Sequence, residues 1–266
     1  MCQWLDRGDG PVGSYDSEML SVQRRDDIAD GIVQLTIDRP DRRNAVDRNT
    51  LSAMHTALGG PATDAKVVVL TGAPPAFCAG ADLGDVDESE FTALLGEVLS
   101  GIGALSVPVI AAIDGPALGA GTQLAIACDL RVATASSHFG IPAARLGLMV
   151  DRWTVERLGA EFGWAIARDM LLAATTYGAE DLLRAGAVHR IGDLSSALEW
   201  AAEIAVLAPL SIAGHKLALE AVSSPDARTD VDALIEAARQ RAWTSDDARE
   251  GRQAFLEKRP ARFGGT

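Results

Sequence analysis

The chain has 266 residues, of which 48% are hydrophobic and 23% charged, a composition typical of a globular protein with a core of useful size. Its net charge of −13 argues against non-specific nucleic-acid binding. It contains no apolar run of about 18 residues, so we expect no membrane span.

The three cysteines, Cys2, Cys78 and Cys128, have neither paired nor metal-like spacing. The first residues lack the basic region and apolar core of a secretory signal. These features predict a cytoplasmic protein with no disulfide, no metal site and no resident cofactor.

The predicted elements follow a first segment, residues 1–20, that is rich in glycine and is expected to be a flexible leader. Strands are predicted where apolar residues alternate or run continuously, at 31–37, 66–71, 107–113 and 130–134. Helices are predicted between the strands, at 47–58, 91–105 and 121–128. From about residue 151 the pattern is helical, at 154–158, 164–173, 179–185, 195–207, 211–222 and 230–244. The order predicts an α/β fold with parallel strand pairing, followed by an all-helical back third.

Two runs of small residues each follow a predicted buried strand, at 77–82 and at 115–121. Small residues let a ligand approach the backbone closely. The second run leads into a helix, whose first N–H groups are unpaired and whose dipole favours negative charge. Side by side, the runs would aim two N–H groups at one thioester oxygen and form an oxyanion hole. The alternative for each run is tight packing of a strand against a helix.

The chain resembles the crotonase, or enoyl-CoA hydratase/isomerase, superfamily over about residues 20–264. The motifs that carry the resemblance are DRPDRRNA at 38–45, AFCAGAD at 76–82, VPVIAAIDGPA at 107–117 and GAGTQLAIACD at 119–129, with shorter matches at 139–142, 185–188 and 255–260. The resemblance implies a crotonase-like spiral of ββα units over 21–200 and a helical trimerisation region over 201–266. It also implies acyl-CoA as the ligand or substrate, and a homotrimer or dimer of trimers.

The resemblance also assigns site residues. It implies that Ala81 and Ala120 supply the oxyanion N–H groups. It places six residues along coenzyme A, the last two often from a neighbouring subunit: Arg42, Arg43, Ala45, Ala79, Phe255 and Lys258. Because the ligand and the chain are both anionic, the site needs a local basic patch, and Arg39, Arg42 and Arg43 are candidates.

Two positions depart from the family pattern. Hydration of an enoyl thioester needs a base to activate water and an acid to protonate the α-carbon. The family's two glutamates align with Gln123 and Ala143, and neither residue can perform these steps. The chain thus resembles acyl-CoA-binding, hydratase-like members of the family that lack the catalytic glutamates.

One acid remains in the neighbourhood. The resemblance places Asp151 where some dienoyl-CoA isomerases carry an aspartate, and the nearby Trp153 is a candidate for lining the acyl channel. The alternative for Asp151 is that it caps a helix beginning at Arg152. Four other residues are expected to be structural rather than catalytic: Cys78, Asp82, Asp129 and His138.

These observations predict a protein that binds or shuttles fatty acyl-CoA in lipid metabolism with little or no hydratase activity. A second hypothesis is an acyl-CoA lyase or isomerase, in which Gln123 positions water or substrate and Asp151 is the single base. A third is a structural partner of lipid-biosynthesis enzymes, against which the retained loops argue.

Overall fold

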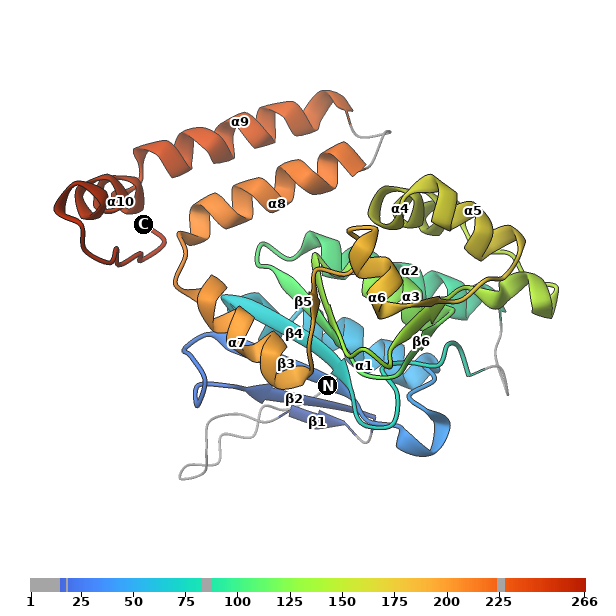
Figure 1. Ribbon diagram of the computed structural model, residues 1–266. Helices are drawn as coiled ribbons and strands as arrows, with labels where there is room; N and C mark the ends of the chain where they lie inside the picture. The colour runs from blue at the N-terminus through green and yellow to red at the C-terminus, as the bar shows by residue number, and fades with distance from the viewer. Residues whose placement is uncertain (1–14, 18, 83–87, 224–227) are drawn as a thin grey trace.

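A computed structural model describes residues 15–17, 19–82, 88–223 and 228–266 (Figure 1). Its large sheet has the order β1-β2-β3-β4-β5-β7-β10, in which β1 and β2 pair antiparallel, as do β2 and β3, and the other pairs are parallel. The strands are β1 Tyr15–Ser17, β2 Leu20–Arg24, β3 Ile32–Ile37, β4 Val67–Gly72, β5 Val109–Ile113, β7 Leu130–Ala133 and β10 Arg190–Ile191. A small sheet joins β6 Pro116–Leu118, β8 His138–Gly140 and β9 Tyr177–Gly178.

The helices lie on both faces of the large sheet and continue beyond it. They are α1 Arg48–Leu58, α2 Glu88–Ala104, α3 Ala120–Ala127, α4 Arg152–Phe162, α5 Trp164–Leu172, α6 Ala179–Arg184, α7 Leu194–Ala205, α8 Pro209–Ser223, α9 Arg228–Thr244 and α10 Asp246–Glu257. Short 3-10 helices span Pro40–Arg42, Pro61–Asp64 and Pro142–Leu146. The predicted α/β fold with a helical back third is therefore confirmed.

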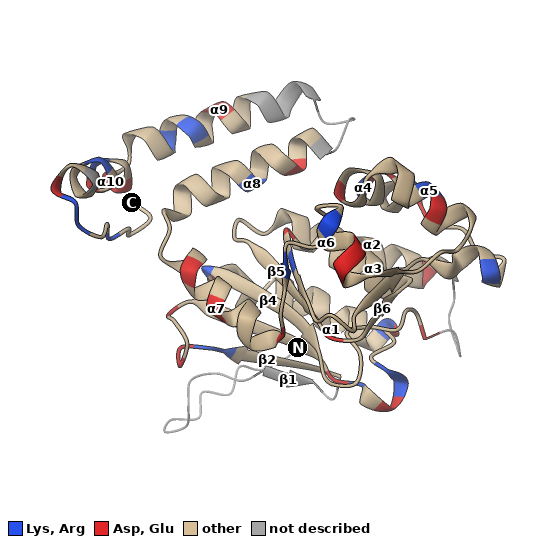
Figure 2. Ribbon diagram, viewed as in Figure 1, with Lys and Arg blue, Asp and Glu red and all other residues tan. Residues whose placement is uncertain are grey.

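The central strands β4 and β5 are almost entirely apolar, because both of their faces are covered. In β4, Val68 and Leu70 point into the cluster formed with α1, α2 and α3, whereas Val67 and Val69 point into the cluster formed with α7. Alternate side chains of a strand face opposite sides, so a doubly covered strand needs apolar residues at every position. Figure 2 shows the central strands and α3 free of charged residues.

Two expected boundaries change in the structure. The expected leader reached residue 20, but Tyr15–Ser17 pairs with β2 as a strand, and Leu20 is fully buried. Residues 1–14 lie outside the described part of the chain. The boundary expected after residue 200 falls within α7, whose Ala197, Leu198 and Ala201 pack on the large sheet. The helices α9 and α10 extend away from the sheet (Figure 1).

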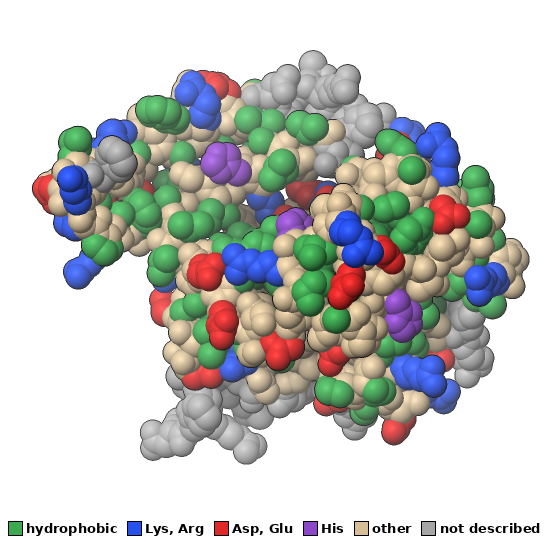
Figure 3. All heavy atoms as spheres, in the orientation of Figure 1, with side chains coloured by type: hydrophobic (Ala, Val, Ile, Leu, Met, Phe, Trp, Pro, Cys, Tyr) green, Lys and Arg blue, Asp and Glu red, His purple; other side chains and the backbone are tan. Residues whose placement is uncertain are grey.

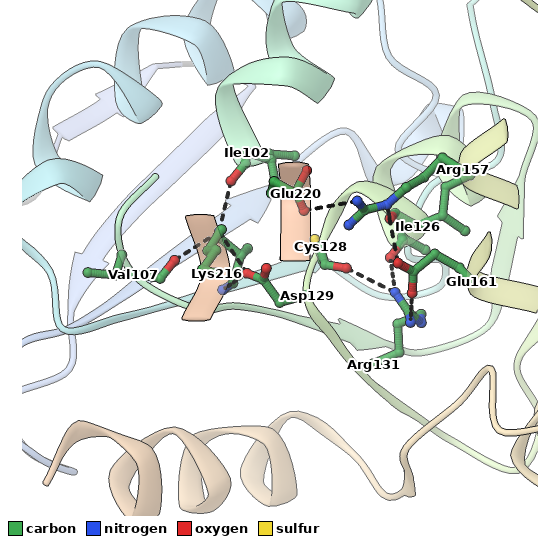
Figure 4. A network of polar contacts seen from close by, with 12 residues as sticks. Ile102, Val107, Ile126, Cys128, Asp129, Arg131, Arg157, Glu161, Lys216 and Glu220 are labelled. Carbon is green, nitrogen blue, oxygen red and sulfur yellow. Dashed lines mark hydrogen bonds and ion pairs between the residues drawn. The ribbon is translucent and has the colours of Figure 1, made fainter. Parts of the chain in front are cut away.

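A buried polar network fastens α8 to the sheet and to α3 (Figure 4). The Lys216 ammonium on α8 donates to Ile102 O at 3.0 Å, to Val107 O at 2.9 Å and to the Asp129 carboxylate at 2.7 Å. These three bonds satisfy all the donors of a side chain that would otherwise be costly to bury. Asp129 also accepts from Val109 N at 2.7 Å, which confirms its structural role.

The second half of the network closes the C-terminal end of α3. Arg157 donates to Ile126 O at 2.8 Å and pairs with Glu220 of α8 at 2.9 Å. Arg131 donates to the carbonyls of Ala125 and Cys128. The last carbonyls of a helix lack partners within the helix, so these two arginines anchor α3 at that end.

Among the described residues, no single helix is both long enough and apolar enough to span a membrane. The helices α7 and α8 meet the criterion only as a pair, and they are bent by 112° at the break between them.

Candidate functional site

The two predicted loops of small residues lie against each other. Cys78 N donates to Pro116 O at 3.1 Å, and Leu118 N donates to Cys78 O at 3.0 Å, so the loops pair like parallel strands. The contact is close enough to require glycine at position 121, because a Cβ atom there would lie 2.1 Å from Cys78 O. Tight packing and close backbone approach, offered above as alternatives, are therefore features of one arrangement.

Ala81 lies in the first loop between two backbone groups that bond to Val46. Val46 pairs with the first loop by donating to Gly80 O at 2.8 Å and by accepting from Asp82 N at 2.9 Å. In a parallel bridge the residue between these two groups turns its own N–H to the opposite side. Residues 116–118 pair with Cys78, three residues before Ala81.

Ala120 is the first residue of α3, directly after Gly119, whose φ is 52°. This positive φ suits glycine, and the chain enters the helix directly after it. The first N–H groups of a helix have no partner within it, and they carry the positive end of the helix dipole. The fold thus brings together the two loops whose N–H groups the resemblance assigns to an oxyanion hole.

A polar scaffold holds the first loop in place. Asn44 is fully buried, and its amide donates to Ala73 O and Ala76 O at 2.6 Å each while accepting from Arg39 N at 2.8 Å. The Arg39 guanidinium lies 3.0 Å from both Asp47 and Asp82 and also donates to Ala45 O. The motif at 38–45 contained both side chains, but nothing in its pattern indicated these partners.

This scaffold corrects the expected basic patch. Arg39 is mostly buried and committed to two carboxylates, whereas Arg42 and Arg43 are exposed. Asp82, expected to be structural, accepts a hydrogen bond from Arg39 at 3.0 Å through its side chain. Ala79 joins the arginine loop to the first small-residue loop, because its N–H donates to Arg43 O at 3.0 Å.

Gln123 lies one helical turn beyond Ala120 on α3. Residues three apart share one face of a helix, and side chains lean toward its N-terminus, so the Gln123 side chain points toward the turn that carries Ala120. Only 9% of the residue is exposed, and its Nε2 donates to Thr154 Oγ1 on α4 at 2.7 Å. Thr154 is fully buried and was not identified in the sequence, because its role depends on how α4 packs against α3.

Asp151 is the N-cap of α4, as its alternative interpretation predicted. Its Oδ1 accepts from Thr154 N at 2.9 Å, and its backbone is extended. The residue is exposed. Trp153 and Ala143 are both half-buried against the core cluster that contains α3.

The remaining candidates lie in different parts of the fold. Lys258 is exposed and follows α10, which Figure 1 shows well away from β6 and α3. The side chain of Phe255 lies outside the described residues. His138 is on β8, with Nδ1 3.5 Å from Ser136 O. Cys78 is fully buried, as expected, and this burial raises the pKa of its thiol to about 11.

Comparison with known proteins assigns most of the chain to one family. Residues 27–266 match the model of the family described as Enoyl-CoA hydratase/isomerase. The chain belongs to this family. A relative from Mycobacterium leprae, named "Probable enoyl-CoA hydratase echA6", is 39% identical over 245 residues, which cover 90% of this chain and 98% of the relative.

Less similar proteins also match over most of their length. The mitochondrial methylglutaconyl-CoA hydratase of Mus musculus is 32% identical over 281 residues, covering 97% of this chain and 89% of the mouse protein. The crystal structure of enoyl-CoA hydratase EchA1 from Mycobacterium marinum superposes with a TM-score of 0.77 at 33% identity. That superposition covers 93% of this chain and 100% of the EchA1 chain.

Proposed function

We propose that this family member binds fatty acyl-CoA thioesters between its two loops and hydrates them little or not at all. The N–H groups of Ala81 and Ala120 would hold the thioester oxygen. The observation that carries the proposal is the environment of Gln123. Its amide is buried and hydrogen-bonded to Thr154, and the residue lies on the same face of α3 as Ala120. An amide in this place can hold a ligand, but it has no useful pKa for moving a proton.

The chemistry of hydration supports weak turnover. A positioned acid or base contributes about 10²–10⁴-fold in rate. The resemblance aligns the family's two glutamates with Gln123 and Ala143, which supply an amide and a methyl group. Asp82 is engaged by Arg39, and one carboxylate oxygen of Asp151 caps α4. The paired loops need neither glutamate, so binding would survive without turnover.

The anionic end of the ligand needs cations in a chain of net charge −13. Arg42 and Arg43 are exposed, and their loop contacts the first small-residue loop through the hydrogen bond from Ala79 N to Arg43 O. In this position they would bind the coenzyme A phosphates. Phe255 and Lys258 would come from a neighbouring copy in a homotrimer or a dimer of trimers, because α10 extends away from the loops of its own chain.

The C-terminal helical region, residues 201–266, has an exposed apolar surface that such an assembly would cover. Leu207, Val222 and Leu234 are 51%, 83% and 57% exposed. Figure 3 shows hydrophobic side chains gathered over α8 and α9, and a groove of about 550 Å³ lies among α8, α9 and α10. Surfaces of this kind are typical of protein interfaces.

A second candidate function is a lyase or isomerase with Asp151 as its single base. The hydrogen bonds that connect Asp151 to Thr154, and Thr154 to Gln123, favour it, since they link an exposed carboxylate to a side chain beside the proposed thioester site. Asp151→Asn would then abolish isomerisation, whereas it would leave acyl-CoA affinity nearly unchanged in a binding protein.

The deciding experiment is a calorimetric titration with palmitoyl-CoA and with crotonyl-CoA, after which the crotonyl sample is assayed for loss of enoyl-thioester absorbance. Tight binding of palmitoyl-CoA without loss of that absorbance supports the proposal. Rapid turnover would contradict it. Ala120→Leu tests the site, because a bulky side chain beside the proposed oxyanion group should weaken binding of both ligands, and unchanged affinity would overturn the site.

A further inference from the structure

The carboxylate of Glu220, on α8, lies between α2 and α4. Its Oε1 accepts a hydrogen bond from Arg157 of α4 at 2.9 Å (Figure 4). Its Oε2 lies close to α2, because a Cβ atom added to Gly103 would be 2.9 Å from it. Real Cβ atoms essentially never have contacts under 3.0 Å, so glycine at position 103 is what lets the carboxylate occupy this place.

Arg157 connects this carboxylate to α3 as well as to α4. Its guanidinium is buried, donates to Ile126 O in the last turn of α3 at 2.8 Å, and lies 3.3 Å from Glu161 of its own helix. A planar guanidinium with several fixed donors holds its partners at defined angles. Arg157 therefore fixes how α4 packs against α3, and Glu220 holds Arg157 from α8.

Glu220 is not needed merely to fasten α8 to the core. Lys216 lies one turn earlier on the same face of α8, and it already donates three hydrogen bonds to the core, none of them to α4. The pairing of Glu220 with Arg157 thus adds a connection from α8 to the packing of α4 on α3.

We propose that Glu220 is a positioning residue, which holds α4 against α3 and thereby sets the affinity for the acyl part of the ligand. The inference rests on the proposed acyl-CoA site. Ala120 begins α3, and Trp153, the candidate for lining the acyl channel, is in the first turn of α4. A change in the packing of the two helices would alter the space between these residues, so an acyl chain there would lose contacts.

The coenzyme A part of the ligand should not depend on Glu220. It would bind at Arg42 and Arg43, whose loop is held by Arg39 and Asn44. The hydrogen bonds and ion pairs of those two side chains involve neither α4 nor α8. The proposal therefore predicts a loss of affinity that is confined to the acyl part, whereas a residue that only stabilised the fold would affect both parts or neither.

Two substitutions remove the connection in independent ways. Glu220→Ala deletes the carboxylate, and Arg157 keeps Ile126 O and Glu161 as partners, so the chain should still fold. Gly103→Ala keeps Glu220 but puts a Cβ atom where its Oε2 lies, so the carboxylate must move away. Because alanine is the better helix former, Gly103→Ala provides the result even if Glu220→Ala fails to fold.

Two further variants are the controls. Gly96→Ala makes the same change on the same helix, at a position where the added Cβ meets nothing within 4 Å. Glu220→Gln keeps an oxygen that can accept from Arg157, so it should retain most of the acyl affinity.

The measurement is calorimetric titration of the full chain with octanoyl-CoA and with free coenzyme A. In Glu220→Ala and in Gly103→Ala, the Kd of octanoyl-CoA should rise by about 2–30-fold, the range for residues that influence a site without touching its ligand. The Kd of free coenzyme A should stay at the wild-type value. Gly96→Ala should bind both ligands as the wild type does.

The outcomes are distinct. If the wild type binds octanoyl-CoA no more tightly than free coenzyme A, the proposed acyl site and this inference both fail. If the wild type prefers octanoyl-CoA but Glu220→Ala or Gly103→Ala keeps the wild-type ratio of the two Kd values, the inference alone is overturned. Equal weakening of both ligands would also overturn it, because Glu220 would then support the fold in general.

Discussion

Gly121→Ala is the substitution that tests most directly whether the closeness of the two loops creates the site. Its Cβ would lie 2.1 Å from Cys78 O, and contacts under 3.0 Å are essentially never seen for real Cβ atoms. The difference, 0.9 Å, is the least by which the loops must separate or deform. The clash is between the added Cβ atom and the backbone oxygen of Cys78, so no side-chain rotation can relieve it.

The expected effects follow from this displacement. Overpacking of a well-packed interior costs about 1–3 kcal/mol of unfolding free energy. Moving one loop by about 0.9 Å would also lengthen a hydrogen bond of about 2.9 Å beyond its useful range, and losing one such bond weakens acyl-CoA binding by about 10-fold. The measurements are urea denaturation and calorimetric titration with butanoyl-CoA.

The matched control is Gly96→Ala on α2, where an added Cβ meets nothing within 4 Å. Alanine is the better helix former by about 1 kcal/mol, so this variant should be equal to or more stable than the wild type and should bind acyl-CoA normally. The reasoning is refuted if Gly121→Ala is as stable as Gly96→Ala, or if it folds and binds butanoyl-CoA with wild-type affinity.

Two further predictions concern stability. Lys216→Met should lower the unfolding free energy by about 3–5 kcal/mol in urea denaturation, because it leaves Asp129 without its buried cationic partner, and a loss below about 1 kcal/mol would contradict that role. Burial and a nearby arginine lower the pKa of His189 below its ordinary 6.5. The unfolded chain therefore takes up a proton before the folded one does, so the unfolding free energy should decrease as the pH falls from about 7.5 to about 5.5. His189→Asn should flatten that decrease, and an unchanged slope would show that other groups cause it.

Several elements could be predicted because their pattern is local. The strands β4 and β5 read as continuous apolar runs, since helices cover both of their faces. The Asp151 cap follows from an aspartate just before a helical pattern. The small sheet was not predicted, because strands of two or three residues are too short for periodicity to register.

The sequence by itself determined the composition of the site: two loops of small residues, an amide at position 123 and a methyl group at position 143. Only the tertiary structure decided which side chains meet, since Gln123 and Thr154 are 31 residues apart and Arg39 and Asp82 are 43 apart. The physical reason is that a hydrogen bond between distant segments depends on the angle at which two elements pack, and it leaves no periodic trace in either segment. The functional group that each residue carries is local information, whereas its partner and its orientation are properties of the packed core.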